Sequence, residues 1–201
     1  MKYTYLAIQH TYETFEMALF IDNQYVDKIS EDKRHTSKLF IPLLQQLLSK
    51  NAISFAELSF CAVNCGPGPF STLRSILASV NGLHTATNIP LIDIDGLEAT
   101  FLEFYDPTYE NTIVLLNAFN NESYYLIATG DKVKSTGYKN TDLLMQEIEE
   151  QFPASTINII DNKMCSIETI GRLGYEKFMA QGAGSGYLMP LHLKKHPVEL
   201  V

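Results

Sequence analysis

A loop of alternating glycine and proline, Gly66-Pro67-Gly68-Pro69, is the feature of the sequence best placed to do chemistry. It joins an apolar run to a long helical pattern, and a glycine-rich turn at a helix N-terminus can cradle a phosphate. Such a cradle depends on backbone N–H donors, and Pro67 and Pro69 have none. Glycine lets the chain turn sharply, and proline suits the first turn of a helix. We therefore expect a rigid helix start here rather than a phosphate site.

The histidines are poor candidates for a metal site. His35 begins a helical pattern, but the residue one turn later is Leu39, which cannot ligate a metal. His192 and His196 are also four residues apart, but prolines bracket them and a site needs further ligands in a defined geometry. The serines of the helical pattern at 70–87 lack the Gly-x-Ser-x-Gly spacing of a nucleophile elbow. We therefore predict no metal, no cofactor and no catalytic residue.

The charge balance argues against direct binding to nucleic acid. The chain of 201 residues has 15 Lys and Arg against 23 Asp and Glu, a net charge of −8. Proteins that bind phosphates strongly carry basic patches, and no basic run here is longer than Lys194-Lys195.

Three cysteines without a CxxC pair indicate reduced, buried thiols. The first residues form a strand pattern rather than a signal peptide, and no run approaches about 18 apolar residues. We expect a cytoplasmic protein that binds no membrane.

Strand and helix patterns follow one another in the same order in both halves of the chain. In the first half, hydrophobic periodicity and turn residues predict strands at 3–9, 15–21 and 25–30, a helix at 36–50, a strand at 60–64, a helix at 70–87, a strand at 89–95 and a helix at 96–105. In the second half, they predict strands at 112–118, 123–129 and 132–138, a helix at 143–151, a strand at 156–160 and a helix at 167–179.

The repeated order β-β-β-α-β-α predicts a duplicated α/β fold. Each half is expected to form a lobe with a mixed sheet flanked by helices. This element order is typical of the actin-like (ribonuclease H-like) superfamily. The break at Asp106-Pro107 divides the chain into lobes at 1–105 and 106–201. Residues 188–193 of the tail are expected to lie back across the first lobe.

Four stretches of the chain together resemble the TsaB (YeaZ) family. The stretch at 64–74, Asn-Cys-Gly-Pro-Gly-Pro-Phe-Ser-Thr-Leu-Arg, resembles the GRGPGSFTGLR signature of that family. The stretches at 34–42, 88–99 and 190–195 resemble its RHSExLLP helix start, its GIPLVGVSSLEAL segment and its PLYLRR ending. The resemblance covers the first half of the chain well and the second half thinly.

The resemblance implies an actin-like protein without its own chemistry. Its larger relative TsaD carries the nucleotide, the metal and the transferase site, and TsaB pairs with TsaD through two helices of its first half. The ATPase TsaE joins the complex, which attaches a threonylcarbamoyl group to an adenosine next to the tRNA anticodon. The resemblance thus implies a TsaD-like partner, a TsaE-like ATPase within the complex, and contact with tRNA only through the complex.

Two hairpin turns depart from the pattern of active members of the superfamily. Such members carry Asp with Gly or Thr in these turns, where the Asp organises a Mg²⁺ hydration shell. Here the first turn is predicted at 9–13 and begins with Gln9-His10, and the second, at 117–121, begins with Asn117. Gln and Asn supply no negative charge for Mg²⁺. This argues against ATP hydrolysis, although an active actin-like ATPase or kinase with replacement residues remains the alternative function.

The helices predicted at 36–50 and 70–87 carry more apolar residues than one buried stripe needs. One face of each helix must pack on its own sheet, and a second apolar face is a candidate interface. The occupant is either a TsaD-like subunit or a second copy of this chain. The predicted partner-binding residues are His35, Leu39, Leu43, Phe70, Leu73, Arg74 and Leu77.

Overall fold

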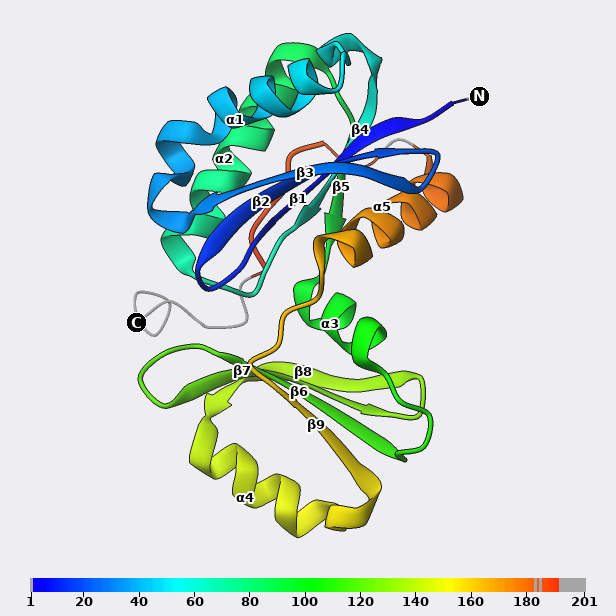
Figure 1. Ribbon diagram of the computed structural model, residues 1–201. Coiled ribbons are helices and arrows are strands. Elements are labelled where there is room, and N and C mark those ends of the chain that lie inside the picture. The colour runs from blue at the N-terminus through cyan, green and yellow to red at the C-terminus, as the bar shows by residue number, and fades with distance from the viewer. Residues whose placement is uncertain (1, 183, 185, 192–201) are drawn as a thin grey trace. The chain divides into compact units, whose positions relative to one another are not determined.

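The computed structural model describes residues 2–182, 184 and 186–191, which cluster into two compact units. Unit 1 comprises the described residues of 2–95 and 166–190, and unit 2 comprises 96–165 together with Leu191. Figure 1 shows both units as a sheet covered by helices. This is the α/β architecture that the element order predicts, with a mixed sheet and flanking helices in each unit.

Unit 1 is built on a five-stranded sheet in the order β3-β2-β1-β4-β5. The strands β1 (Thr4–His10), β2 (Thr14–Ile21) and β3 (Gln24–Asp32) form an antiparallel meander. The strands β4 (Leu58–Asn64) and β5 (Leu91–Ile94) then extend the sheet in parallel with β1. Every residue of β1 is buried, which is expected of a central strand covered on both faces.

Two helices lie side by side on one face of this sheet (Figure 1). The short helix η1 (Lys33–His35) leads into α1 (Thr36–Lys50), and a second short helix, η2 (Phe55–Glu57), precedes β4. The Gly-Pro loop leads into α2 (Phe70–Thr87), which ends where Asn88 adopts a left-handed φ of 58°. Alternate strand residues such as Leu6 and Ile8 meet Leu44, Leu47 and Ile76 of the two helices in the main core. Alternate residues of the strands and one face of each helix therefore form a single apolar layer between the sheet and the two helices.

The other face of the sheet packs against α5 (Ile167–Gln181), which follows unit 2 in the sequence. Ser166 caps this helix by accepting a hydrogen bond from Thr169 N–H at 3.3 Å. A Cβ at Gly174 would lie 2.2 Å from the Cβ of Ala62, so glycine is what lets the helix approach the sheet closely. Phe178 stacks on Phe60 with ring centroids 4.3 Å apart. These contacts place α5 in unit 1.

Unit 2 is built on a four-stranded sheet in the order β8-β7-β6-β9. Its strands are β6 (Asn111–Asn117), β7 (Glu122–Thr129), β8 (Lys132–Asn140) and β9 (Ile157–Asp161). The helix α4 (Thr141–Gln151) covers one face through Leu144 and Ile148, which pack on Ile113 and Leu115. The helix α3 (Gly96–Phe104) packs on β6 and β7, and a short helix, η3 (Ala154–Thr156), precedes β9. Figure 1 shows α3 and α4 on opposite faces of the sheet.

The predicted helices and strands are all present, within a few residues of their expected bounds. The division into units differs from the expected one at 105–106. The helix α3 packs on the second sheet, and α5 packs on the first, so each joins the unit that buries its apolar side. Among the described residues, no helix is long and apolar enough to cross a membrane.

Candidate partner-binding interface

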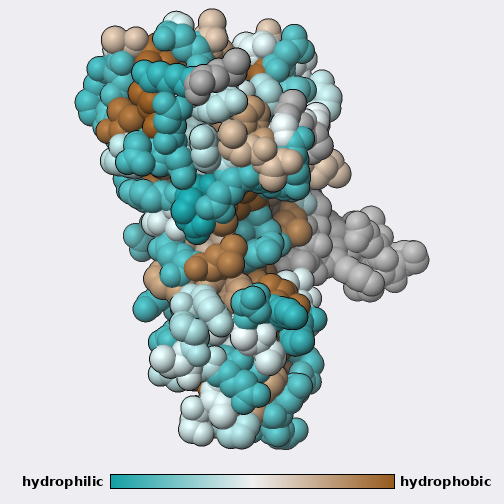
Figure 2. Space-filling view, turned by 90° about the vertical axis from the view of Figure 1, so that its right-hand side faces the viewer, coloured by the Kyte–Doolittle hydropathy of each residue, from teal (hydrophilic) through white to brown (hydrophobic). Residues whose placement is uncertain are grey.

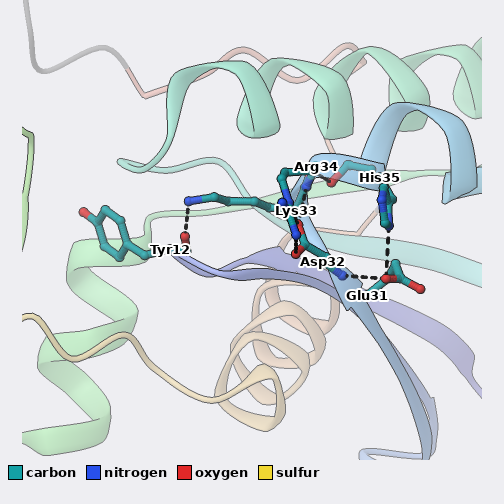
Figure 3. A network of polar contacts seen from close by, with 7 residues as sticks. Tyr12, Glu31, Asp32, Lys33, Arg34 and His35 are labelled. Carbon is teal, nitrogen blue, oxygen red and sulfur yellow. Dashed lines mark hydrogen bonds and ion pairs between the residues drawn. The ribbon is translucent and has the colours of Figure 1, made fainter.

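A polar network fixes the short helix that leads into α1 (Figure 3). The Asp32 carboxylate accepts hydrogen bonds from the Arg34 backbone N–H at 2.8 Å, from Nε at 2.9 Å and from Nη2 at 2.7 Å. The paired guanidinium and the backbone donor hold the pKa of Asp32 well below its usual range. His35 Nδ1 lies 3.3 Å from Glu31 Oε1, and the His35 side chain is exposed. The predicted partner-binding histidine therefore stands at the surface, beside a carboxylate of the preceding strand.

The first two turns of α2 present an aromatic ring and a guanidinium together at the surface. Phe70 is 50% exposed although it is a large apolar residue. The guanidinium carbon of Arg74 lies 3.7 Å from the centroid of the Phe70 ring, which is cation–π geometry. One turn and two turns further along α2, the exposed residues Ala78 and Gly82 continue the same line. A Cβ at Gly82 would meet nothing within 4 Å, so the surface is open at this position.

Leu73 and Leu77 do not belong to that surface. They are 4% and 3% exposed and pack in the main core of unit 1. Their positions on α2 put them on the side of the helix that faces the sheet, so the prediction that they contact a partner is corrected to a core role. Leu39 and Leu43 on α1 are half-buried, and Leu43 packs against the same core.

Sequence reasoning missed Ile41, which is 43% exposed on α1. The signal was available in its spacing. The buried residues of α1 include Phe40, Leu44 and Leu47, and Ile41 lies about 100° away from Phe40 around the helix. The exposed large apolar residues of the two neighbouring helices are thus Ile41 and Phe70, beside the half-buried Leu39 and Leu43.

The helix α5 covers the face of the first sheet opposite to α1 and α2 (Figure 1). Figure 2 views the molecule from that side, and its surface over unit 1 is mostly hydrophilic, with small separate apolar patches. Met179 on α5 is 52% exposed, nearly the same fraction as Phe70. Since α5 and α2 cover opposite faces of the sheet, Met179 is a matched reference for any test of the α1–α2 surface.

The first predicted turn is shorter than expected, because β1 continues through His10. Strand pairing places His10 opposite Phe15, and the side chain is fully buried. Neither ring nitrogen of His10 has a hydrogen-bond partner among the described residues, and burial lowers the pKa of His10 to about 4. Gln9 is also buried, and its Nε2 donates to Glu16 Oε2 at 2.9 Å. Both residues are therefore packed into the sheet rather than presented from a turn.

The Gly-Pro loop is closely fitted to that buried histidine. A Cβ at Gly68 would lie 1.9 Å from Cε1 of His10, so the imidazole occupies the space that any side chain at position 68 would need. The loop is also held at its start, where Gly66 N–H donates to Asn64 Oδ1 at 2.9 Å. The loop thus fixes the start of α2, which agrees with the structural role expected from its composition.

The second turn presents an aromatic residue in a left-handed conformation. Phe119, Asn120 and Asn121 have φ values of 63°, 54° and 57°. Asn117 Oδ1 accepts a hydrogen bond from Phe119 N–H at 2.7 Å, and Phe119 is 52% exposed. Residues with positive φ other than glycine are uncommon, and Asn tolerates this conformation best. Asn117 contributes an amide oxygen to the turn and supplies no charge for a metal ion.

Within the ranges that the structure describes, no group of three or more His, Cys, Asp or Glu side chains could hold a metal ion. His192 and His196 lie outside these ranges. The cysteines at 61, 65 and 165 are buried thiols, as their spacing predicts, and burial raises the pKa of the Cys61 and Cys65 thiols to about 12. Such thiols stay protonated and are poor nucleophiles.

Known structures with this topology are available. A YeaZ structure from Pseudomonas aeruginosa aligns with a TM-score of 0.73 at 17% identity, over 95% of this chain and 100% of that one. A second structure from the same organism, described as a protein with similarity to peptidase YeaZ, aligns with a TM-score of 0.74 at 17% identity, over 96% and 100%. These alignments and the two mixed sheets define a protein with a duplicated actin-like α/β fold.

Sequence comparisons give the family. A family model described as "TsaD: tRNA N6-adenosine threonylcarbamoyltransferase" matches residues 28–172, which is most of the chain. The tRNA threonylcarbamoyladenosine biosynthesis protein TsaB of Buchnera aphidicola is 26% identical over 133 residues, 63% of this chain and 58% of that protein. A tRNA N6-adenosine threonylcarbamoyltransferase of Solidesulfovibrio magneticus is 43% identical over 61 residues, 30% of this chain and 16% of that protein. The chain belongs to this family, among its TsaB (YeaZ) proteins. It spans less than two thirds of the length of the TsaB relative.

Proposed function

We propose that the chain is a non-catalytic partner subunit of the complex that forms threonylcarbamoyladenosine in tRNA. In this role it binds and supports a TsaD-like transferase subunit through the surface formed by α1 and α2. A TsaE-like ATPase joins through the complex, and tRNA is bound by the complex rather than by this acidic chain. The complex works in the cytoplasm. Membership of the TsaB (YeaZ) proteins supports this proposal.

The observation that carries the proposal is the exposed Phe70–Arg74 pair on α2. A large aromatic ring stacked under a guanidinium is the kind of anchor that dominates interface energies. Arg74 can also reach a carboxylate on the partner, for which its planar fork is suited. Ile41 and the half-buried Leu39 and Leu43 extend the apolar area onto the neighbouring α1.

The environments of Gln9, His10 and Asn117 support the absence of a catalytic role. Gln9 and His10 are buried within the sheet, and Asn117 supplies no negative charge for Mg²⁺. Calorimetric titration of the purified chain with ATP and Mg²⁺ tests this directly. We expect no micromolar binding and no ATP turnover above background. Clear binding by the lone chain would favour the alternative, an active actin-like ATPase or kinase.

The interface is tested by co-purification with a TsaD-like protein from the same genome. Single variants Phe70→Glu and Arg74→Glu should lose the partner, because each places an unpaired charge in a desolvated contact. Both residues are exposed in the lone chain, and Glu at position 70 lies in the first turn of α2, where a negative charge is favourable, so the variants should fold normally. Met179→Glu on α5 is the matched control and should still co-purify. If the α2 variants affect only self-association, the occupant of this face is a second copy of the chain.

A further inference from the structure

The chain end that follows α5 returns to α2 and is held there by one side chain. The amide of Asn81 donates from Nδ2 to the carbonyl of Leu188 at 2.9 Å and accepts at Oδ1 from the N–H of Leu188 at 2.8 Å. Both backbone groups of Leu188 are therefore satisfied by a single residue of α2. Such a paired contact fixes the position and the direction of the tail segment, defined here as residues 186–190.

Packing supports the same placement of the tail segment. The Leu188 side chain is 4% exposed and belongs to the main core of unit 1. The Tyr187 ring meets the His84 ring edge-on with centroids 5.5 Å apart, and Thr85 Oγ1 lies 3.3 Å from the Tyr187 hydroxyl. The tail segment is thus docked on the C-terminal half of α2. This agrees with the expectation for residues 188–190, whereas residues 192 and 193 of that expectation lie outside the described residues.

The residues on either side of Leu188 are unusually exposed. Tyr187 is 63% exposed and Met189 is 75% exposed, the highest fractions among the large hydrophobic residues that the structure describes. Their neighbour Leu188 is anchored through its backbone and its side chain, so these two side chains are presented from a fixed segment. Tyrosine and methionine are favoured at protein interfaces. A fixed, exposed apolar pair on a docked segment indicates a contact surface.

Helix geometry places this pair on the same side of α2 as the Phe70–Arg74 surface, about three turns further along the helix. Thr85 follows Arg74 by eleven residues, which is close to three helical turns, so both lie on the same exposed side of α2. The tail contacts α2 at Asn81, His84 and Thr85, at the edge of that side. The exposed stripe of α2 therefore has the docked tail along one edge.

We propose that the tail segment forms one wall of the partner-binding face, and that Tyr187 and Met189 contact the TsaD-like subunit directly. The inference rests on the proposed function, and it adds a contact outside the two helices. Asn81 is a positioning residue in this arrangement, because it holds the wall in place without reaching the partner itself.

The test is the affinity of the full chain for the TsaD-like subunit from the same genome, measured by calorimetry. The double variant Tyr187→Ser, Met189→Ser should bind at least about tenfold more weakly, since each lost anchor typically reduces affinity severalfold or more. Met179→Ser on α5 is the matched control and should bind within twofold of the unsubstituted chain. Thermal unfolding should change little in either variant, because all three side chains are more than half exposed.

Asn81→Ala separates positioning from contact. Hydrogen exchange of the Leu188 amide should become faster, because its acceptor is lost, and affinity should fall while Tyr187 and Met189 are still present. Unchanged exchange together with unchanged affinity would contradict the positioning role.

The outcomes distinguish the two proposals. If the unsubstituted chain binds the TsaD-like subunit and the Tyr187, Met189 double variant binds equally well, the inference about the tail is wrong and the proposed function stands. If the unsubstituted chain does not bind at all, the proposed function is wrong and the inference is overturned with it. If the double variant changes only self-association, the wall contacts a second copy of the chain, and the inference as stated is also wrong.

Discussion

Unit 1 and unit 2 share a run of five elements, after which their element order diverges. Three antiparallel strands, a helix and a parallel strand form β1–β3, α1 and β4 in unit 1, and β6–β8, α4 and β9 in unit 2. Unit 1 then adds α2 and β5 to its own sheet, whereas the helix that follows β9 packs on unit 1 instead. The surface proposed to bind a partner lies on α2 and its neighbour α1. The candidate interface thus combines α1, whose counterpart in unit 2 is α4, with α2, for which no helix is packed in the same way on the second sheet.

The largest effect should come from placing a charge on the buried side of α2. Leu77→Glu buries a carboxylate in the main core and should destabilise unit 1 by more than about 4 kcal/mol. Arg74→Glu, three residues earlier on the exposed side, should leave the free energy of unfolding within about 0.5 kcal/mol. Urea denaturation followed by circular dichroism checks both. Equal stability of the two variants would mean that Leu77 does not face the core.

A cavity in unit 2 should reduce stability without affecting the partner. Leu144 on α4 is 2% exposed and packs with Ile113, Leu115 and Ile148. Leu144→Ala should cost about 2–5 kcal/mol of stability, because the lost contacts leave a void. Affinity for a TsaD-like subunit should stay unchanged under conditions where the variant is folded. A fall in affinity comparable to that of Arg74→Glu would place part of the interface on unit 2.

Stability should also depend on pH through His10. The folded-state pKa of His10, about 4, is below its ordinary value, so the unfolded chain binds the proton more readily. Full stability is therefore expected above pH of about 6.5, with a loss of about 3 kcal/mol at most as the pH falls toward 4. Urea denaturation at pH 7 and pH 5 measures this loss. The Asn side chain of the His10→Asn variant does not titrate, so its free energy of unfolding should change much less between pH 7 and pH 5. An equal change in the variant and the unsubstituted chain would show that other groups cause the pH dependence.

Two glycines of unit 1 should respond to alanine in opposite ways. Gly68→Ala forces a Cβ into the His10 ring and should destabilise the protein by about 1–3 kcal/mol. Gly82→Ala, on the open side of α2, should stabilise it by about 0.5–1 kcal/mol, because alanine favours the helix. A double-mutant cycle of Gly68→Ala with His10→Ala should show coupling, since removing the ring restores space. Additive effects in that cycle would show that the two residues do not touch.

The smallest effect concerns the start of α4 in unit 2. Asn140 caps this helix, accepting a hydrogen bond at Oδ1 from Leu143 N–H at 3.2 Å. Asn140→Ala should cost about 1 kcal/mol. Thermal unfolding detects this loss, and Asn140→Asp should retain most of the stability because Asp also caps helices well. An unchanged unfolding temperature of the Asn140→Ala variant would show that the cap contributes nothing to stability here.

The sequence predicts the elements of this fold well because they depend on local patterns. The helix at 70–87 has apolar residues at helical spacing and a Pro-Gly start, and the structure begins and ends α2 at the same residues. The assignment of α3 and α5 to units was not predictable in this way. It depends on which sheet buries their apolar sides, and that is a tertiary contact with no local signal.

The candidate site was only partly predictable for a related reason. Spacing alone identifies two apolar arcs on α2, but it does not say which arc faces the sheet. The sequence therefore predicts both Leu77 and Phe70 as partner-binding residues, although only Phe70 is exposed. The burial of His10 was missed because pairing with β2 extends β1 beyond the expected turn. Tyr187 lies in a segment without periodicity, and its place beside α2 depends on the amide of Asn81, which no pattern marks.

The most direct test of this account is a calorimetric titration of the chain, and of its Phe70→Glu variant, with the TsaD-like subunit from the same genome. We expect the unsubstituted chain to bind and the variant to lose at least about a hundredfold in affinity, as expected for a central anchor residue. The Met179→Glu variant should bind like the unsubstituted chain, because α5 lies on the other face of the sheet. Equal affinities of the Phe70→Glu variant and the unsubstituted chain would contradict the assignment of the partner face to α2.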